Sequence, residues 1–133
     1  MLLARLRALA QMVNSPLIFI IDDDQSVRES VQSLVRSAGY RAEAFASAEE
    51  FLHSCRPATA DCLILDVCLP GTSGLDLQRQ LASCDYRIPI IFITAQDADE
   101  ARVRAMNDGA VEFLFKPFSE GALLTALHSA LKG

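Results

Sequence analysis

Short apolar segments alternate five times with segments of helical periodicity, and this alternation limits the fold more than any other feature of the chain. Three of the apolar segments, 17–22, 61–66 and 89–94, are almost continuously apolar, as is typical of parallel strands covered by helices on both faces. Strands are predicted over 17–22, 41–45, 61–66, 89–94 and 111–115, and helices over 25–37, 48–55, 74–83, 98–107 and 119–131. With right-handed crossovers, this pattern predicts a doubly wound α/β domain of three layers, although it does not give the strand order.

Several helix boundaries carry their own signals. Side chains that can accept hydrogen bonds from free backbone N–H groups precede three of the helices, namely Asp24, Ser47 and Ser119. Ser47 and Glu50 also have the spacing of a capping box, and Gly39 is placed to end the first helix.

The first fifteen residues stand apart from the alternation. Arg5 and Arg7 interrupt the apolar character of this segment, and no basic segment precedes it, so we do not expect it to be a secretory signal peptide. We therefore expect an N-terminal extension, 1–15, and one domain, 16–133. The extension either forms an extra amphipathic helix or precedes an alternative start at Met12; its apolar residues close to one helical face are Leu2, Leu3, Leu6, Leu9 and Val13.

Charge and cysteine content exclude several classes of function. The net charge is −5; residues 1–15 hold two of the twelve basic residues and no acid, so the remainder has ten basic and seventeen acidic residues, a charge of −7. A domain this acidic is a poor candidate for direct binding of nucleic acid. No apolar stretch is long enough to span a membrane. The four cysteines lack Cys-x-x-Cys spacing, which favours reduced thiols in a cytoplasmic protein.

Five polar residues follow the apolar strands and would meet at the carboxyl edge of one parallel sheet: Asp22, Asp23, Asp66, Thr94 and Lys116. Carboxylate oxygens suit Mg²⁺, and a carboxylate can also attack phosphorus to form an acyl phosphate. A lysine and a threonine could then contact the oxygens of the phosphoryl group. The set predicts a site for a divalent cation and a phosphoryl group, with Asp66 as nucleophile.

Ordinary structural roles compete with this interpretation. Asp24 is best explained as a helix cap, but one cap needs one side chain, so capping does not account for both Asp22 and Asp23. A lysine after a strand usually extends into solvent. We predict a cis peptide bond between Lys116 and Pro117, which would turn the chain sharply and fix the lysine side chain; the alternative is a trans bond.

Four motifs resemble the signatures of the receiver domains of two-component response regulators, and they occur in the expected order over 17–131. They are Ile21-Asp22-Asp23-Asp24, Leu65-Asp66-Val67-Cys68-Leu69-Pro70-Gly71-Thr72-Ser73-Gly74, Ile93-Thr94-Ala95 and Phe115-Lys116-Pro117-Phe118. The segments 45–52 and 103–106 are similar to the FixJ-like branch in particular. The resemblance implies a five-stranded parallel sheet of order 2-1-3-4-5, the flavodoxin-like arrangement.

The resemblance also implies roles for individual residues. Asp66 would accept a phosphoryl group from the phosphohistidine of a sensor histidine kinase. Mg²⁺, for which Mn²⁺ can substitute, would be held by Asp22, Asp23, Asp66 and the backbone carbonyl of Cys68. A domain of this kind assists its own phosphorylation and dephosphorylation and is not a turnover enzyme. Cys68 and Gln96 occupy positions that vary in the family and tune hydrolysis.

A conformational switch is implied as well. Thr94 and Lys116 would contact the phosphoryl group, and Thr94 would move toward it while the ring of Phe113 turns inward. The surface formed by the last two helices and the strand between them would change, and would control an output domain or a downstream protein, or homodimerisation. FixJ-like regulators usually carry a C-terminal helix-turn-helix domain; this chain ends at Gly133, so we expect either a stand-alone or an excised receiver.

Three alternatives remain open at this stage. A flavodoxin-like cofactor binder would need a phosphate-cradling loop after the first strand, where three aspartates stand instead. An aspartate-dependent phosphatase would, by resemblance, carry a second acid two residues after its nucleophile, where this chain has Cys68. A receiver-like interaction module that binds partners without phosphorylation is the third.

Overall fold

The computed structural model describes residues 2–6, 15–54, 57–95 and 99–132. Its centre is a five-stranded sheet of order β2-β1-β3-β4-β5, in which all neighbouring strands are parallel. The strands are β1 (Leu17–Ile21), β2 (Arg41–Phe45), β3 (Cys62–Asp66), β4 (Ile90–Thr94) and β5 (Glu112–Phe115). The helices are α2 (Gln25–Ser37), α3 (Ala48–His53), α4 (Gly74–Ser83), α5 (Asp99–Asn107) and α6 (Glu120–Lys132), with a 3-10 turn, η1 (Pro57–Thr59). The predicted doubly wound α/β fold and its strand order are confirmed.

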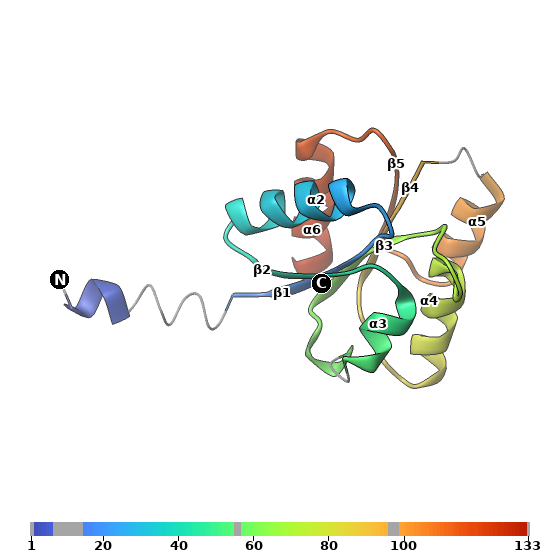
Figure 1. Cartoon of the computed structure of the whole chain (residues 1–133), viewed down its shortest axis with the longest axis horizontal. Coiled ribbons are helices and arrows are strands. Elements are labelled where there is room, and N and C mark those ends of the chain that lie inside the picture. The colour runs from blue at the N-terminus through green and yellow to red at the C-terminus, as the bar shows by residue number, and fades with distance from the viewer. Residues whose placement is uncertain (1, 7–14, 55–56, 96–98, 133) are drawn as a thin grey trace.

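Each face of the sheet is covered by its own helices, so the molecule has three layers (Figure 1). Successive side chains of a strand point to opposite faces. Accordingly, Phe19 and Ile21 of β1 pack with residues of α3, α4 and α5, whereas Ile18 and Ile20 pack with residues of α2 and α6. Every residue of β1, β3 and β4 is buried. Cover on both faces explains why these three strands are almost continuously apolar.

The predicted boundaries differ from the observed ones by small amounts. The helix predicted over 48–55 ends at His53, and the last helix continues to Lys132. Residues 2–6 are helical, and the extension predicted over 1–15 otherwise lies outside the described residues except for Ser15. No helix in the described ranges has both the length and the apolar character needed to cross a membrane.

The helix caps are formed largely as predicted. Asp24 accepts hydrogen bonds from the backbone N–H groups of Ser26 and Val27 at the start of α2. The side chain of Ser47 accepts a hydrogen bond from the N–H of Glu50. The carboxylate of Glu50 accepts one from the N–H of Ala46, and not from that of Ser47 as in a regular capping box. Ser119 accepts from the N–H of Ala122 at the start of α6.

Gly74, the first residue of α4, lies against the backbone of the residue that ends β3. Its N–H donates to the carbonyl of Val67 at 3.0 Å. A Cβ atom at position 74 would lie 3.0 Å from the carbonyl carbon of Asp66, 3.1 Å from Cα of Val67 and still closer to the carbonyl oxygen of Asp66. Only glycine therefore lets α4 start this close to the end of β3.

We expect Gly74→Ala to lower the free energy of unfolding by about 3 kcal/mol, because the new methyl group meets backbone atoms that cannot rotate away. Urea unfolding measures this loss. Gly121→Ala is the matched control, because Gly121 is also near the start of a helix and no atom lies within 4 Å of its added Cβ. The control should be neutral or stabilised by up to about 1 kcal/mol. Equal stability of the two variants would contradict the close approach at Gly74.

Candidate metal and phosphoryl site

The carboxyl edge of the sheet brings three aspartates together. Ile21 of β1 pairs with Leu65 of β3, so Asp22 and Asp66 follow at equivalent positions on neighbouring parallel strands. Asp22 is fully buried and Asp66 is 5% exposed, whereas Asp23 is exposed. One carboxylate oxygen from each of the three lies within 4.8 Å of the others. The sheet therefore places a compact acidic group where the sequence predicted it.

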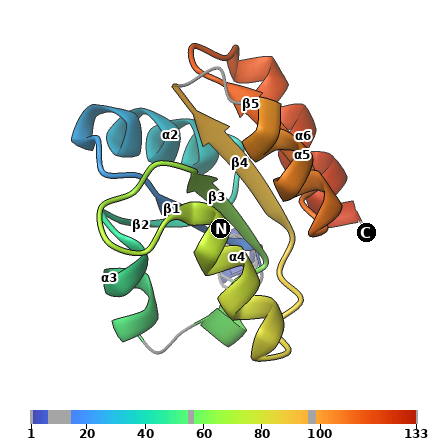
Figure 2. The same ribbon diagram turned by 90° about the vertical axis from the view of Figure 1, so that its right-hand side faces the viewer.

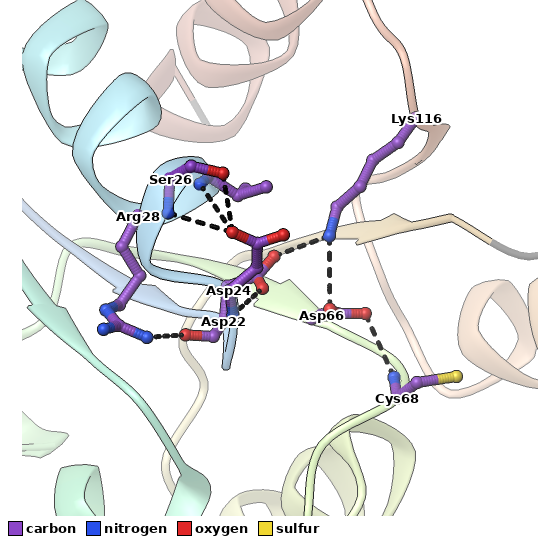
Figure 3. Close-up of polar contacts among 8 residues, drawn as sticks. Asp22, Asp24, Ser26, Arg28, Asp66, Cys68 and Lys116 are labelled. Atoms are coloured by element: carbon purple, nitrogen blue, oxygen red, sulfur yellow. Dashed lines mark hydrogen bonds and ion pairs between the residues drawn. The ribbon is translucent and has the colours of Figure 1, made fainter.

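The backbone around the two buried carboxylates holds them in place (Figure 3). Oδ1 of Asp22 accepts a hydrogen bond from the N–H of Asp24 at 2.9 Å, and Oδ1 of Asp66 accepts one from the N–H of Cys68 at 3.0 Å. Arg28 of α2 donates from Nη1 to the carbonyl oxygen of Asp22 at 2.8 Å. Each carboxylate thus keeps its other oxygen, Oδ2, for a further partner.

That further partner is Lys116, which follows β5. Its Nζ lies 2.7 Å from Oδ2 of Asp22 and 3.2 Å from Oδ2 of Asp66 (Figure 3). The backbone N–H of Lys116 donates to the carbonyl of Thr94 at 2.7 Å, which ties the end of β5 to the end of β4. The Lys116–Pro117 peptide bond is cis, the geometry expected from the sequence.

Burial dominates the electrostatics of Asp66. It raises the pKa of this carboxyl to about 6, helped by the neighbouring charge of Asp22 and opposed by the N–H of Cys68 and the ammonium of Lys116. Burial alone would lower the pKa of Lys116, but the hydrogen bond to Asp22 and the charges of both aspartates outweigh it, so that pKa lies above its ordinary value. Burial therefore disfavours the ionised form of Asp66, and the ammonium of Lys116 partly offsets this effect.

The donor set fits a hard divalent cation. Three carboxylates within reach of one another supply oxygen ligands, two of them at buried and hydrogen-bonded positions. Mg²⁺ is commonly held by a few carboxylates and completes its shell with water and phosphate oxygens. The sulfur of Cys68 points away from the carboxylate of Asp66 (Figure 3), so this residue would contribute its backbone carbonyl and not its thiol.

The two residues of the expected switch both lie in the sheet. Thr94 ends β4 and is fully buried. Phe113 of β5 is already turned inward, with its ring 6.0 Å from that of Phe92 and 5.3 Å from that of Phe115. A swing of the Phe113 ring between outward and inward positions remains a prediction.

Sequence reasoning missed two residues that support the site. Arg28, for which the sequence pattern indicates no role, donates to the backbone carbonyl of Asp22. Glu49 lies between the two capping-box residues Ser47 and Glu50, and it accepts a hydrogen bond from the N–H of Thr72 in the loop after β3. No sequence spacing links Glu49 to Thr72, 23 residues away.

Comparisons with known proteins identify the family. The family model for the response regulator receiver domain matches residues 18–128. Nodulation protein W of Bradyrhizobium diazoefficiens is 49% identical over 114 residues, which cover 86% of this chain and 50% of that protein. Transcriptional regulatory protein FixJ of Azorhizobium caulinodans is 36% identical over 114 residues, covering 86% of this chain and 54% of FixJ. The solved structure of response regulator StyR has a TM-score of 0.83 and 49% identity, covering 89% of this chain and 60% of that one.

These matches agree with the resemblance read from the four motifs, including its FixJ-like character. This chain spans about half the length of the curated relatives that it matches. The family model covers most of the sequence, including every residue of the acidic edge and Lys116. The chain therefore belongs to the family of response regulator receiver domains.

Proposed function

We propose that this domain accepts a phosphoryl group on Asp66 from the phosphohistidine of a sensor histidine kinase. The observation that carries the proposal is the arrangement of two buried carboxylates, Asp22 and Asp66, bridged by the ammonium of Lys116. The ammonium places one positive charge beside the nucleophile, where the negative charge of the phosphoryl oxygens must be balanced during transfer.

In the proposed transfer, an oxygen of Asp66 attacks phosphorus while the P–N bond of phosphohistidine breaks, and the bonding electron pair returns to the imidazole nitrogen. Asp22, Asp23, Asp66 and the carbonyl of Cys68 would hold Mg²⁺, or Mn²⁺ in its place, and the bound cation would neutralise charge on the phosphoryl oxygens. Lys116 would exchange its bond with Asp66 for a phosphoryl oxygen. The protein thus assists a reaction on its own side chain, and the free carboxylate returns only when water hydrolyses the acyl phosphate and releases inorganic phosphate.

The response to phosphorylation is proposed to pass through Thr94 and Phe113 to the surface formed by α5, β5 and α6. Thr94 ends β4, next to β5, whose register pairs Thr94 with Phe115. A hydrogen bond from the Thr94 hydroxyl to the new phosphoryl group would favour one conformation of the ends of β4 and β5 over another. The matched residues make up only about half of each relative, which supports an attached output domain as the recipient of the change. A separate downstream protein and homodimerisation are the other routes.

A mass measurement tests the proposed acceptor function. We expect the protein to gain one phosphoryl group when incubated with Mg²⁺ and a small-molecule acyl phosphate, and to gain none when a chelator removes the metal. Restoring Mg²⁺ or adding Mn²⁺ should restore the gain, because either ion suits oxygen ligands. A folded sample that takes up no phosphoryl group with Mg²⁺ would overturn the proposal in favour of an interaction module that works without phosphorylation. Uptake that persists in chelator would contradict the role given to the aspartates as metal ligands.

A further inference from the structure

Glu49, in the first turn of α3, contacts the loop that follows the proposed phosphoacceptor. Its Oε2 accepts a hydrogen bond from the backbone N–H of Thr72 at 2.9 Å. In Figure 2 the yellow-green loop between β3 and α4 bends toward the start of α3, where Glu49 lies. The contact joins α3 to a loop that begins immediately after Asp66.

The same carboxylate fits closely against Gly71. A Cβ atom at position 71 would lie 2.9 Å from Oε2 and 3.1 Å from Oε1 of Glu49. Gly71 also has a φ of 72°, in the left-handed region that glycine adopts most readily. Hydrogen bonding to Thr72 holds the pKa of Glu49 below its ordinary value, so the group is an anionic acceptor at neutral pH. The loop and the carboxylate therefore have matching shapes as well as a shared hydrogen bond.

Hydrogen bonds hold the loop at its start, at its end and on its far side, and Leu69 packs in the core beneath it. At its start, the N–H of Cys68 donates to Oδ1 of Asp66, and at its end the N–H of Gly74 donates to the carbonyl of Val67. Among the described residues, the far side of the loop, 69–72, is hydrogen-bonded to another element through Thr72 and Glu49. The carbonyl of Cys68, the backbone group expected to bind the metal, lies between these attachments.

We propose that Glu49 is a positioning residue for the metal site: by holding Thr72 it fixes the loop 68–73, sets the direction of the Cys68 carbonyl and so strengthens the binding of Mg²⁺. The inference rests on the proposed function, since it concerns the same metal site. Groups that orient metal ligands from outside commonly affect affinity about tenfold or more. An acid in the first turn of a helix also interacts with the helix dipole, but that interaction needs only the charge and not the contact with Thr72.

Isothermal titration calorimetry of the purified chain with Mg²⁺ alone distinguishes positioning through the hydrogen bond to Thr72 from an effect of the Glu49 charge. We expect Glu49→Ala to weaken Mg²⁺ binding about tenfold, and Glu49→Gln to recover most of the loss because its amide oxygen can accept the same hydrogen bond. Glu50→Ala is the matched control: Glu50 is the next acid in the same helical turn, and it bonds to Ala46 and not to the loop. This control should bind Mg²⁺ as the wild type does.

Hydrogen exchange of the Thr72 amide supplies a readout that needs neither metal nor phosphate. In chelator, the amide should exchange faster in Glu49→Ala than in the wild type or in Glu50→Ala, because it loses its acceptor. Gly71→Ala disturbs the same contact from the loop side, because its new methyl group meets the Glu49 carboxylate, and it should also weaken Mg²⁺ binding. The test therefore does not depend on the folding of a single variant.

The possible outcomes distinguish failure of the positioning role of Glu49 from failure of the proposed function. A wild-type protein that does not bind Mg²⁺ would overturn the proposed function itself. Binding by the wild type with unchanged affinity in Glu49→Ala would overturn the inference alone. A Glu49→Gln variant as weak as Glu49→Ala would show that charge is responsible, and would overturn positioning through the hydrogen bond.

Discussion

Asp66→Asn should take up no phosphoryl group from an acyl phosphate under conditions in which the wild type gains one. A carboxamide oxygen is a poor nucleophile toward phosphorus, and no other described carboxylate combines the burial of Asp66 with its contact to Lys116 except Asp22. We expect the yield to fall by at least about a hundredfold, as is typical when a nucleophile is removed. Intact mass measures the yield. Asp85→Asn makes the same chemical change at an exposed position away from the site and should be labelled as the wild type is.

The same variant should be more stable than the wild type in chelator at pH 8. Burial raises the pKa of Asp66 to about 6 from a reference of 3.8, so the folded protein binds this proton more tightly than the unfolded chain does. A shift of this size sets an upper limit of about 3 kcal/mol on the stability cost of the ionised carboxyl, and screening by solvent reduces it. Asparagine carries no charge and avoids the cost, while Asp22 retains its bond with Lys116.

The sign of this effect sets its pH dependence. Well below pH 4 the carboxyl is protonated in both states, and the two proteins should have nearly equal stability; at pH 4 the gap should already be much smaller than at pH 8. The gap should open as pH rises from about 4 to 6 and stay constant above that. Urea unfolding at pH 4 and pH 8 measures it. A stability difference between the two proteins that is largest at low pH would contradict the buried position of Asp66. In the mass measurement, full labelling of Asp66→Asn would show that another residue is the acceptor.

Much of the fold could be predicted from sequence because burial of the strands and capping of the helices both leave local patterns in the chain. β1, β3 and β4 are covered by helices on both faces, so each reads as a continuous apolar run. Asp24 and Ser119 cap helices through contacts two or three residues away, which sequence spacing shows directly. The strand order came only from family resemblance, because periodicity describes each element alone and not its neighbours.

The supporting contacts of the site could not be predicted for a related reason. Asp22, Asp66 and Lys116 follow strands, and the parallel sheet brings strand ends together whatever lies between them. Arg28 and Glu49, by contrast, reach the site through side chains that extend from helices toward backbone atoms. Such contacts depend on loop conformation and on glycine at positions such as 71, where a side chain would meet the Glu49 carboxylate.

Lys116→Met should destabilise the metal-free protein and at the same time strengthen its binding of Mg²⁺. Methionine keeps most of the length and apolar surface of the lysine side chain but removes the ammonium, which is the cationic partner of both Asp22 and Asp66. Removing one member of a buried ion pair usually costs about 3–5 kcal/mol, because the remaining charge is left without a partner. In chelator at pH 8 we expect a loss of about 3 kcal/mol, measured by urea unfolding.

The loss should shrink as pH falls through the pKa of Asp66, because protonation removes one of the two charges that need a partner. Mg²⁺ should restore stability more fully than in the wild type, since the cation no longer competes with the ammonium for Oδ2 of Asp22 and Asp66; we expect its affinity to rise about tenfold. Lys132→Met is the matched control, because Lys132 is the chain's other lysine and is exposed at the end of α6. Suppose that Lys116→Met and Lys132→Met bind Mg²⁺ with the same affinity and unfold at the same urea concentration. The ammonium of Lys116 would then not balance the two carboxylates in solution, and the charge arrangement on which the proposed phosphoryl transfer depends would have to be abandoned.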